Sequence, residues 1–449
     1  MQSFEIDRSD LQRIKAALEG DDADLEKILK EYHASEIAIL FEKLPKEAKE
    51  KIINILPADF ASEVISEMDE EHHPEDILIS LDPEKRSEIV EEMDYDVATD
   101  IISQLDEDEQ QEILDDIDQE DASNIRTLLT YEEDTAGGLM NTEVLKVNIA
   151  LNKKTALEAV IRQSEEIEEF YTIYAVNDDN ILQGIVSLKS IIKARADALI
   201  KDIVLTDFVY VEADLDQEEV AKLISQYNLT SIPVVDRKMK LLGRITVDDI
   251  IDVMEEENTE DILKISGVSE DEELAGNWQD AVKSRLPWLI VNLGTAFLAA
   301  SIIRSFEDTA EKLPIIAAYM IIIAGMGGNA ATQALAVTVR RISLSDLTDR
   351  QAYNTVFKEF LVGMINGACN GLIVLLVAVL YDSNPMLGLV MFLAMTFNLL
   401  IAGITGATIP LVLKRLGIDP AVASSIIITT FTDCFGFLLP LWLASRLLL

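Results

Sequence analysis

Five long apolar segments in the last part of the chain constrain its fold more than any other feature of the sequence. Each of them reaches the roughly 18–25 residues that a helix needs to cross a lipid bilayer. They lie at about residues 286–303, 313–339, 356–380, 387–413 and 421–443. The sequence therefore predicts a membrane part of five helices, and an odd number of spans places the two ends of the chain on opposite sides of the membrane.

Basic residues that flank these segments indicate which side each end occupies. With the N-terminus inside, eight lie on cytoplasmic flanks: Lys283, Arg285, Arg340, Arg341, Arg350, Lys358, Lys414 and Arg415. Three lie on outer flanks: Arg304, Lys312 and Arg446. Because cytoplasmic loops are enriched in Lys and Arg, we expect a multi-pass protein of the cytoplasmic (inner) membrane, in contact with lipid, with its N-terminus in the cytoplasm and its C-terminus outside. The opening residues lack the basic region and apolar core of a signal peptide.

The part of the chain before residue 285 is very acidic. Residues 285–449 hold 9 of the 81 acidic and 10 of the 37 basic side chains, which leaves 72 acids and 27 bases, a net charge of −45, in residues 1–284. Such a surface repels nucleic acid and attracts cations, so no nucleic-acid partner is expected. A plain solvated acidic surface is the alternative. With three His and two Cys in the chain, a His- or thiolate-ligated metal centre is not expected.

A short repeat runs through the first ~130 residues. An apolar residue followed by Pro or Asp recurs every twelve residues, with one spacing of thirteen, at Leu44-Pro45, Leu56-Pro57, Met68-Asp69, Leu81-Asp82, Met93-Asp94, Leu105-Asp106 and Ile117-Asp118. Pro and Asp are residues that begin helices. The repeat predicts a superhelix of short helices, with a plain helical bundle as the alternative.

From about residue 135 the pattern changes to short strands. The runs FYTIYAV (170–176) and ILQGIVSL (181–188) are β-branched and aromatic, and residues 229–236, 241–246 and 248–250 repeat the series strand, Gly-marked strand, helix. This series resembles a cystathionine-β-synthase (CBS) domain, and residues 135–200 resemble a weaker partner. Tandem CBS units generally pair into one module. The resemblance implies regulation, often by a nucleotide, so ATP is a candidate ligand.

An ionisable residue inside the last apolar segment is the first candidate for function. Asp433 lies well within it, and a lone carboxylate at that depth costs several kcal/mol unless it faces a polar interior. Thr429, Thr430 and Thr432 add oxygen atoms around it. These residues favour an ion path; a protonated carboxyl bonded to a neighbouring helix is the alternative. We expect no second carboxylate inside a span, since Asp382 and Asp419 lie at span ends.

The second apolar segment carries a matching irregularity. It contains the glycine run Gly325-Met326-Gly327-Gly328, followed by Asn329, Thr332 and Gln333. Helix packing would explain the glycines but not the polar residues. Hard cations prefer oxygen ligands, and Mg²⁺ gives up its water reluctantly, so a pore that holds hydrated Mg²⁺ through carbonyls, amides and a carboxylate suits this chemistry. One Asp433 per chain is weak for a divalent ion, so we expect a homodimer with one central pore.

Over essentially the whole chain, this order of parts resembles the MgtE family of Mg²⁺ channels. The segment 131–140 (YEEDTAGGLM) resembles that family's junction before the first CBS unit, Gly325 to Asn329 its pore-helix motif, and Asp433 its pore aspartate. The resemblance implies pore or ion-binding roles for Gly325, Gly328, Asn329, Thr332, Thr429, Thr430 and Asp433. Some relatives carry a second Gly-Asn where this chain has Ala331-Thr332, so the role of position 332 is left open.

The expected fold is an α-helical superhelix (1–132), an α/β tandem CBS module (133–200 and 201–257), a connecting helix (258–284) and an α-helical transmembrane domain of five helices (285–449). In the MgtE family the cytoplasmic part closes the pore when Mg²⁺ is plentiful. Like charges that repel at low Mg²⁺ and are bridged by bound ions would permit this here. The expected regulatory ligands are Glu63, Asp96, Asp100, Asp248, Asp249, Asp252, Glu255, Glu256, Glu257, Glu260, Asp261 and Asp419.

Three other classes of protein share some of these features. A secondary transporter for Mg²⁺ or Co²⁺ shares most of them, although no inverted repeat is evident among the five spans. An intramembrane aspartyl protease needs two carboxylates in the membrane, and we expect one, so no enzymatic activity is expected. A membrane-anchored CBS sensor without a pore has no use for Asp433 or for a buried Asn329.

Overall fold

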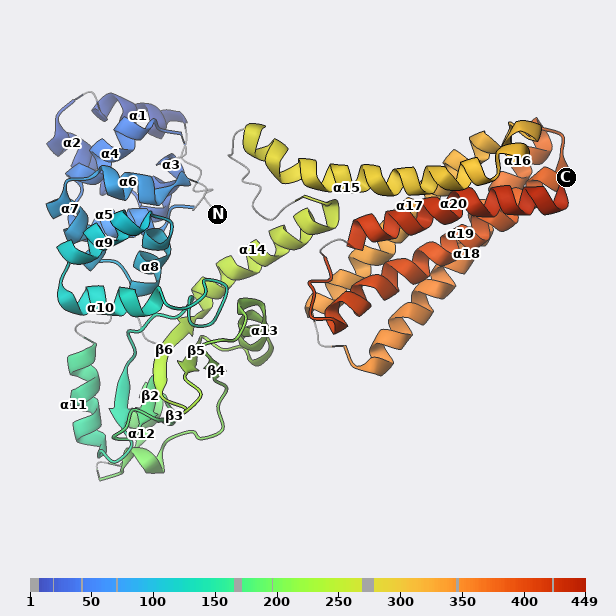
Figure 1. Cartoon of the computed structure of the whole chain (residues 1–449). Helices are drawn as coiled ribbons and strands as arrows, with labels where there is room; N and C mark the ends of the chain where they lie inside the picture. The colour runs from blue at the N-terminus through green and yellow to red at the C-terminus, as the bar shows by residue number, and fades with distance from the viewer. Residues whose placement is uncertain are drawn as a thin grey trace. The chain divides into compact units, whose positions relative to one another are not determined.

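The computed structural model describes residues 8–18, 20–41, 43–69, 72–164, 172–195, 197–268, 278–344, 347–421 and 424–449. They form two compact units, Met1–Glu256 and Glu257–Leu449, which Figure 1 draws in one colour sequence along the chain. Residues 170–171 of the first predicted strand and residues 269–277 of the predicted connecting segment lie outside the described residues.

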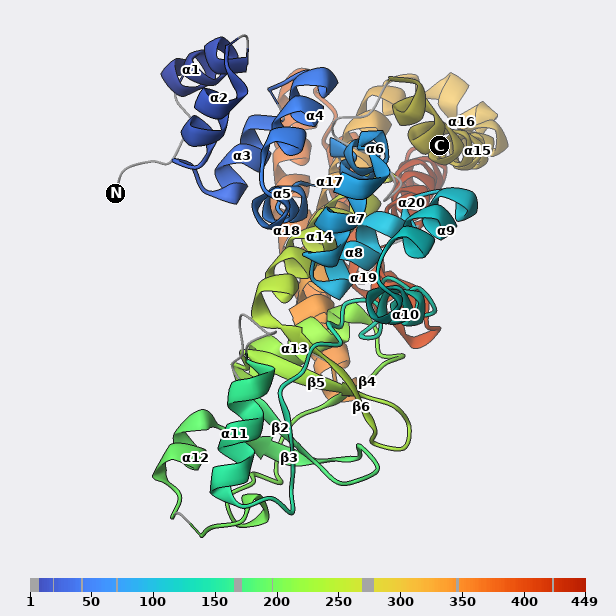
Figure 2. The same ribbon diagram turned by 90° about the vertical axis from the view of Figure 1, so that its left-hand side faces the viewer.

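The first unit begins with a stack of short helices (Figures 1 and 2). They are α1 (Arg8–Leu18), α2 (Asp22–Leu29), α3 (Ala34–Phe41), α4 (Lys46–Ile55), α5 (Ala58–Ser66), α6 (Pro74–Ser80), α7 (Pro83–Glu91), α8 (Tyr95–Ser103), α9 (Glu107–Asp116) and α10 (Gln119–Leu128). From α2 onward each helix packs against the helix two places further along, α2 on α4 and α3 on α5, up to α8 on α10. Even-numbered and odd-numbered helices therefore form two layers, as the predicted superhelix requires.

The twelve-residue repeat sets where these helices begin. Helices α7, α8, α9 and α10 start at residues 83, 95, 107 and 119, each directly after an Asp in extended conformation. The apolar residue before the cap points into the core, where Leu56 and Met93 are buried. The predicted start after Asp69 falls on residues 70–71, which lie outside the described residues; α6 begins at Pro74 after His73, whose φ is +52°. Pro at the first helical position has the fixed φ that a helix needs.

Two small sheets of identical topology follow. The strands are β1 (Lys146–Asn148), β2 (Ile173–Val176), β3 (Leu182–Val186), β4 (Val211–Glu212), β5 (Ser231–Val235) and β6 (Leu241–Thr246). In each sheet the first strand is parallel to the second and the second is antiparallel to the third. The duplication extends to a register shift after Ala175 in one sheet and after Val234 in the other, opposite Gly184 and Gly243.

Short helices complete both units, and the pair of strand–helix units confirms the tandem CBS architecture. The helices are α11 (Lys153–Gln163), α12 (Leu188–Lys193), the 3₁₀ turn η2 (Ile200–Asp202) and α13 (Gln217–Tyr227). Backbone hydrogen bonds also join the two CBS units. The backbone N–H of Leu182 donates to the carbonyl of Met239, and that of Leu241 donates to the carbonyl of Asn180. The cores of the two sheets therefore join at their hairpins.

Helix α14 (Val247–Ser266) begins in the first unit and ends in the second. Its start is fixed by Asp249, whose Oδ2 accepts hydrogen bonds from the backbone N–H and the hydroxyl of Thr246, at 3.1 and 2.6 Å. A carboxylate in the first turn also interacts favourably with the helix dipole.

The second unit is helical. It contains α15 (Trp278–Ser305), α16 (Glu307–Lys312), α17 (Ile316–Leu344), α18 (Asp349–Tyr381), α19 (Pro385–Arg415) and α20 (Ser424–Leu447). Among the described residues, five of these helices are long and apolar enough to cross a membrane, at Ala281–Ser305, Ile316–Ser343, Asp349–Tyr381, Pro385–Arg415 and Ser425–Leu447. The five predicted spans are confirmed, and the short helix α16 between the first two was not predicted.

Helix α19 occupies the centre of this unit and contacts α17, α18 and α20, whereas α15 packs on α20 with most of its side chains exposed. A glycine stripe brings α18 and α19 together. A Cβ placed on Gly363 or Gly367 would lie 2.6 Å from the carbonyl oxygen of Leu399 or 2.8 Å from that of Thr396. Small residues permit such close approach of membrane helices. The α18–α19 pair formed in this way is the pair against which α17 and α20 pack, through α19.

Candidate functional site

Asp433 lies in the first half of α20 and is half-buried within its own chain. The residues on either side of it pack closely against α17. Thr432 is fully buried, and a Cβ placed on Gly436 would lie 2.8 Å from the Cα of Ala324. The carboxylate is therefore not sealed among apolar side chains of its own chain, although it lies on a tightly packed helix.

The hydroxyls of the threonines near Asp433 donate hydrogen bonds to backbone carbonyls of their own helix. Thr429 donates to the carbonyl of Ser425 at 2.8 Å, Thr430 to that of Ile426 at 2.6 Å and Thr432 to that of Thr429 at 3.0 Å. A hydroxyl that donates in this way keeps its oxygen lone pairs. Thr429 and Thr430 are both half-exposed, so their oxygens remain available to an ion or its water.

The glycine run of α17 has two faces. Gly325, Asn329 and Thr332 are exposed, Gly328 is half-exposed, and no described atom would lie within 4 Å of a Cβ on Gly325 or Gly328. Gly327 faces the other way, into the contact with α19 and α20. The predicted residues thus share one open stripe of α17, at the spacing of a single helix face, with Thr332 tied to it by a hydrogen bond to the carbonyl of Gly328 at 3.1 Å.

The open stripe of α17 and Asp433 lie at the same level of the bundle. A Cβ on Gly327 would lie 3.4 Å from the Cβ of Thr432, and each of the predicted residues Gly328 and Asp433 is one position further along its own helix. The structure therefore brings the glycine motif and Asp433 to neighbouring positions on two adjacent helices.

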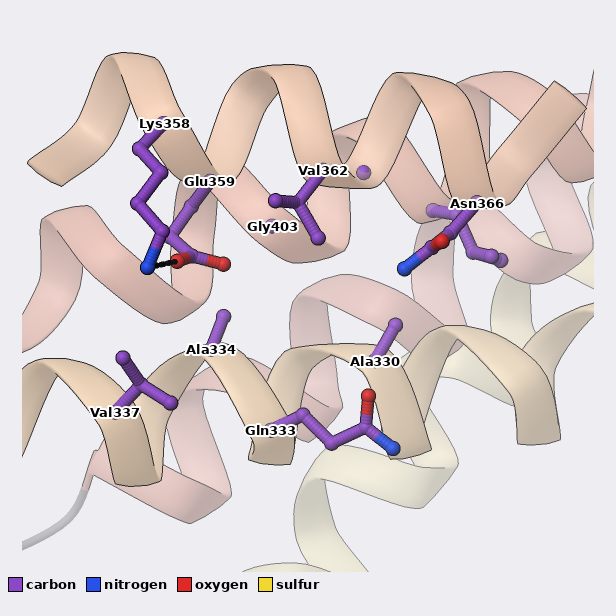
Figure 3. Close-up of a pocket in the computed structure, with 11 residues that line it drawn as sticks. Ala330, Gln333, Ala334, Val337, Lys358, Glu359, Val362, Asn366 and Gly403 are labelled. Atoms are coloured by element: carbon purple, nitrogen blue, oxygen red, sulfur yellow. Dashed lines mark ion pairs between the residues drawn. The ribbon is translucent and has the colours of Figure 1, made fainter.

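A groove lies between α17 and α18, with α19 as its floor (Figure 3). Its volume is about 240 Å³, and Gln333 from α17 and Asn366 from α18 line it. Glu359 also lines it and is 6% exposed; one of its carboxylate oxygens lies 3.6 Å from the Nζ of Lys358. The expectation of no second carboxylate within a span was wrong, because Glu359 falls inside both the predicted segment 356–380 and the observed helix. Asp433 is not among the residues that line this groove.

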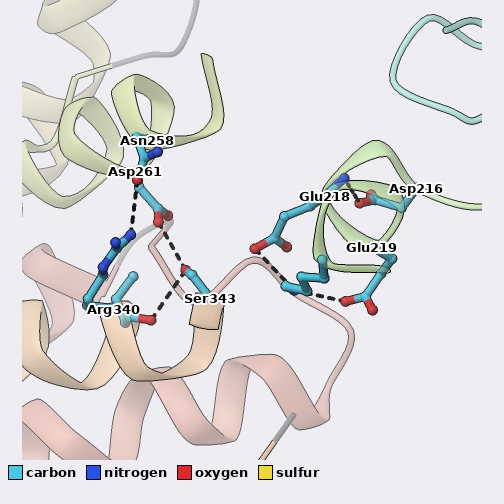
Figure 4. Close-up of polar contacts among 9 residues, drawn as sticks. Asp216, Glu218, Glu219, Asn258, Asp261, Arg340 and Ser343 are labelled. Carbon is cyan, nitrogen blue, oxygen red and sulfur yellow. Dashed lines mark hydrogen bonds and ion pairs between the residues drawn. The ribbon is translucent and has the colours of Figure 1, made fainter. Parts of the chain in front are cut away.

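The end of α14 is bonded to the ends of two membrane segments. Arg340 Nη1 donates to Asn258 Oδ1 and Ser343 Oγ donates to Asp261 Oδ2, both at 3.1 Å (Figure 4). Lys264 pairs with Glu260 one turn away and with Asp419, 3.0 Å from its Nζ, just before α20. Three of the predicted regulatory acids, Glu260, Asp261 and Asp419, therefore meet here, together with a lysine that the sequence did not single out.

A second acidic group lies in the first unit, between α8 and the start of α14. Asp96 is 8% exposed. Burial raises the pKa of Asp96 well above its usual range, and the charges of Asp249, Asp94 and Asp100 raise it further. Burial likewise raises the pKa of Asp249, against the hydrogen bonds from Thr246.

One carboxylate oxygen of Asp96 accepts two hydrogen bonds. Asn141 Nδ2 donates to Asp96 Oδ1 at 3.3 Å, and the backbone N–H of Val97 donates to the same oxygen at 3.1 Å. Burial raises the pKa of Asp252 as well, with Asp249 as the largest charge acting on it. These carboxylates repel one another, and a cation placed among them would relieve that repulsion.

The remaining predicted regulatory acids are more scattered. Asp248, Glu255 and Glu256 are exposed on α14, and Glu257 is half-exposed. Glu63 is exposed on α5, on a different helix from Asp96. Within the described ranges no group of three or more Asp, Glu, His or Cys side chains is close enough to hold a metal ion. A regulatory Mg²⁺ would therefore need other oxygens and its own water, as this ion generally does.

Comparison with known proteins agrees with these features. A family model described as "Divalent cation transporter" (MgtE) matches residues 320–443, the "MgtE intracellular N domain" matches residues 32–134, and a CBS domain matches residues 200–256. The magnesium transporter MgtE of Thermus thermophilus is 33% identical over 450 residues, which covers 97% of each chain. The chain belongs to the MgtE family.

Other MgtE proteins extend this result. The magnesium transporter MgtE of Bacillus subtilis is 30% identical over 99% of this chain and 98% of its own, and that of Enterococcus faecalis is 37% identical over 72% of this chain and 71% of its own. Residues 320–443, which the transporter model matches, contain Asp433, the open stripe of α17 and Glu359. The membrane unit of this MgtE chain is therefore a transporter unit.

Two solved structures resemble the soluble part of the chain. One is the cytosolic domain of the Mg²⁺ channel MgtE in complex with ATP, at 34% identity and a TM-score of 0.51, covering 54% of this chain and 98% of that one. The other is the soluble part of a magnesium transporter, at 28% identity and a TM-score of 0.50, covering 55% of this chain and 97% of that one. Both support the MgtE arrangement of a helical N domain followed by a CBS pair.

Proposed function

We propose that this MgtE chain is a channel that imports Mg²⁺ across the cytoplasmic membrane. The observation that carries the proposal is the open stripe of α17 beside Asp433 on α20. Asn329 and Thr332 are polar residues of a membrane helix that face away from their own chain, and Gly325 and Gly328 keep that face narrow. Polar groups at membrane depth are tolerated where they line a water-filled path.

A homodimer supplies the second wall of this path. In this proposal the open stripe and Asp433 face the same side of the bundle, and a twofold axis beside them would place the same residues of a second copy opposite. Two Asp433 carboxylates would then match the charge of one divalent ion. Backbone carbonyls exposed at the glycines, the amide of Asn329 and the oxygens of Thr429 and Thr430 would contact its water shell.

We further propose that cytoplasmic Mg²⁺ closes the pore through the acidic groups. Asp96, Asp249 and Asp252 repel one another in the first unit, which favours looser packing of α8 against the start of α14 when no cation is bound. Mg²⁺ among them would favour the compact arrangement, and the ligand shifts the equilibrium by binding one state more tightly. In the second unit the docked end of α14, bonded to Arg340 and Ser343, would correspond to the closed state.

The expected division of the chain and its orientation are part of the same proposal. The cytoplasmic part would consist of the N domain (1–132), the two CBS units (133–200 and 201–257) and the connecting helix (258–284). The pore domain, surrounded by lipid, would be residues 285–449. The C-terminus would lie outside. The relative whose cytosolic domain was solved with ATP supports ATP as a ligand of the CBS pair. Calorimetric titration of the purified chain with ATP, together with protease protection by ATP, tests this. If ATP produced neither binding heat nor protection, it would not be a ligand of this chain.

Complementation of a strain that cannot take up Mg²⁺ tests the pore directly. Wild type should restore growth at low Mg²⁺, and Asp433→Ala should not. Asp308→Ala is the matched control, because Asp308 is an exposed carboxylate on α16 and its loss should leave growth unchanged. Equal rescue by Asp433→Ala would remove the pore assignment and favour a membrane-anchored CBS sensor.

Single-channel recording separates a channel from a secondary carrier for Mg²⁺ or Co²⁺. Unitary currents that fall as internal Mg²⁺ rises are expected for the proposed channel, and a chain lacking residues 1–258 should conduct without that fall. Saturable flux without unitary currents would make the protein a carrier. A truncated chain that still closed normally would end the regulatory part of the proposal.

A further inference from the structure

Asn398 is a fully buried amide in the centre of the membrane unit. It lies on α19 and is 0% exposed. Its Nδ2 donates a hydrogen bond of 2.9 Å to the backbone carbonyl of Ile323 on α17. An amide in the middle of an otherwise apolar span is costly, and this bond accounts for its donor.

That bond is made next to the glycine run of α17. In an α-helix the carbonyl of residue i accepts from the N–H of residue i+4, so the carbonyl of Ile323 is the helical acceptor for Gly327. A Cβ on Gly327 would lie 2.2 Å from Nδ2 of Asn398, so no larger residue at 327 is compatible with this position of the amide. Asn398 therefore registers α19 against the turn of α17 that carries Gly325 and Gly328.

The acceptor of Asn398 is open. Its Oδ1 is buried and has no hydrogen-bond partner among the described residues. Such a group costs free energy and calls for an explanation. The side chains nearest to a Cβ on Gly327 belong to Asn398 and Thr432, and Thr432 directly precedes Asp433. The hydroxyl of Thr432 donates to the carbonyl of Thr429 on its own helix.

We infer that Asn398 is a positioning residue of the ion path. Its amide N–H holds the glycine turn of α17, and the contact of that amide with Gly327 lies beside Thr432, so one side chain sets the spacing between the open stripe and the turn of α20 that carries Asp433. This inference rests on the proposed pore. It assigns no contact with the ion to Asn398 itself.

The first test separates positioning from packing. Asn398→Leu keeps the volume of the side chain and removes its hydrogen bonds. In the purified full-length protein in liposomes, we expect Mg²⁺ flux to fall about tenfold, and the ratio of Mg²⁺ flux to Ca²⁺ flux to change at least about threefold, at equal reconstituted amounts of protein. A residue that only packs would leave that flux ratio unchanged in the folded fraction. An unchanged ratio would overturn the inference.

The second test uses the contact between Asn398 and Gly327. Gly327→Ala alone should reduce flux about tenfold, because the new methyl displaces the amide, whereas in an Asn398→Ala background the same change should cost less than about twofold. Equal effects of Gly327→Ala in both backgrounds would refute the contact. Asp433→Ala, measured in parallel, identifies the other failure: if it keeps wild-type flux, the pore itself is wrong, whatever Asn398 does.

Discussion

Alanine substitutions at glycines of the membrane unit should separate packing glycines from path glycines. Gly367 packs on the backbone of Thr396, whereas among the described residues nothing lies within 4 Å of a Cβ on Gly325, Gly328 or Gly294. Gly294 lies on the exposed helix α15. The same one-methyl change therefore meets backbone at the first position, open space on the proposed ion path at the next two, and open space on α15 at the last.

The magnitudes follow from these distances. At Gly367 a Cβ would lie 2.8 Å from a carbonyl oxygen and 2.9 Å from a Cα, neither of which can move alone, so the helices must separate. Overpacking of this kind costs about 1–3 kcal/mol, or about 2–12 °C in Tm for a unit of this size. At Gly325, Gly328 and Gly294 alanine instead favours the helix by up to about 1 kcal/mol, so Tm should stay or rise.

Two assays on the same purified variants decide the matter: thermal unfolding in detergent and Mg²⁺ flux into liposomes. Gly325→Ala and Gly328→Ala should lose at least about tenfold in flux, about 1.4 kcal/mol of barrier, at wild-type Tm. Gly294→Ala should change neither quantity, and Gly367→Ala should lower Tm. Wild-type flux in the Gly325 and Gly328 variants would place the stripe outside the ion path. A fall in their Tm like that of Gly367→Ala would make them packing residues of an interface.

Three further outcomes are expected. Asp96→Asn should raise the protease protection of α8 in the Mg²⁺-free full-length protein. Because burial raises the pKa of Asp96, the wild-type protein should lose that protection as pH rises toward the raised pKa and regain it when Mg²⁺ is added. The variant should respond weakly to both changes, and a variant with the wild-type pH response would contradict this prediction. Ser343→Ala removes the hydrogen bond to Asp261 and should raise the internal Mg²⁺ that half-closes the channel about two- to fivefold, and a lower half-closing concentration would reverse the role given to the docked helix. Arg86→Ala should lower the free energy of unfolding of the helical stack by about 2–3 kcal/mol, since Arg86 is 3% exposed and donates hydrogen bonds to two acids of α9. Denaturant unfolding measures this loss. A loss under about 0.5 kcal/mol would mean that these ion pairs contribute no more than a surface ion pair.

Much of the fold follows from local patterns. The apolar–Pro and apolar–Asp steps place most of the N-terminal helix starts because caps and first-turn prolines act within a few residues. Helix α6 starts at Pro74, whose fixed φ suits a first helical residue. The duplicated strand pattern marks both CBS units for the same local reason. Lengths of apolar sequence predict the five spans because the bilayer sets that length.

Only part of the candidate site could be predicted from local sequence patterns. Asp433, Asn329 and the glycines stand out because polar or flexible residues are rare in apolar spans. Asn398 meets the same criterion, yet the sequence does not say which face of a nearly uniformly apolar helix is buried, or which carbonyl a buried amide meets. Glu359 adjoins Lys358, a basic residue expected on a cytoplasmic flank, so its position in the sequence does not mark it as a carboxylate within a span. Partners such as Lys264 and Asp419 depend on how distant helices approach each other.

Helix α14 is one uninterrupted rod of 20 residues, about 30 Å long, and it is shared by two units that are otherwise separate in the chain. Hydrogen-bonded helices compress and stretch very little, so in the proposed closing mechanism this helix is the element that would carry a movement from Asp249 toward Asp261. A proline near Glu257 would break that rod and leave each half folded but mechanically independent. The proposed sensing and the proposed conduction would then persist in the same molecule as two unconnected behaviours.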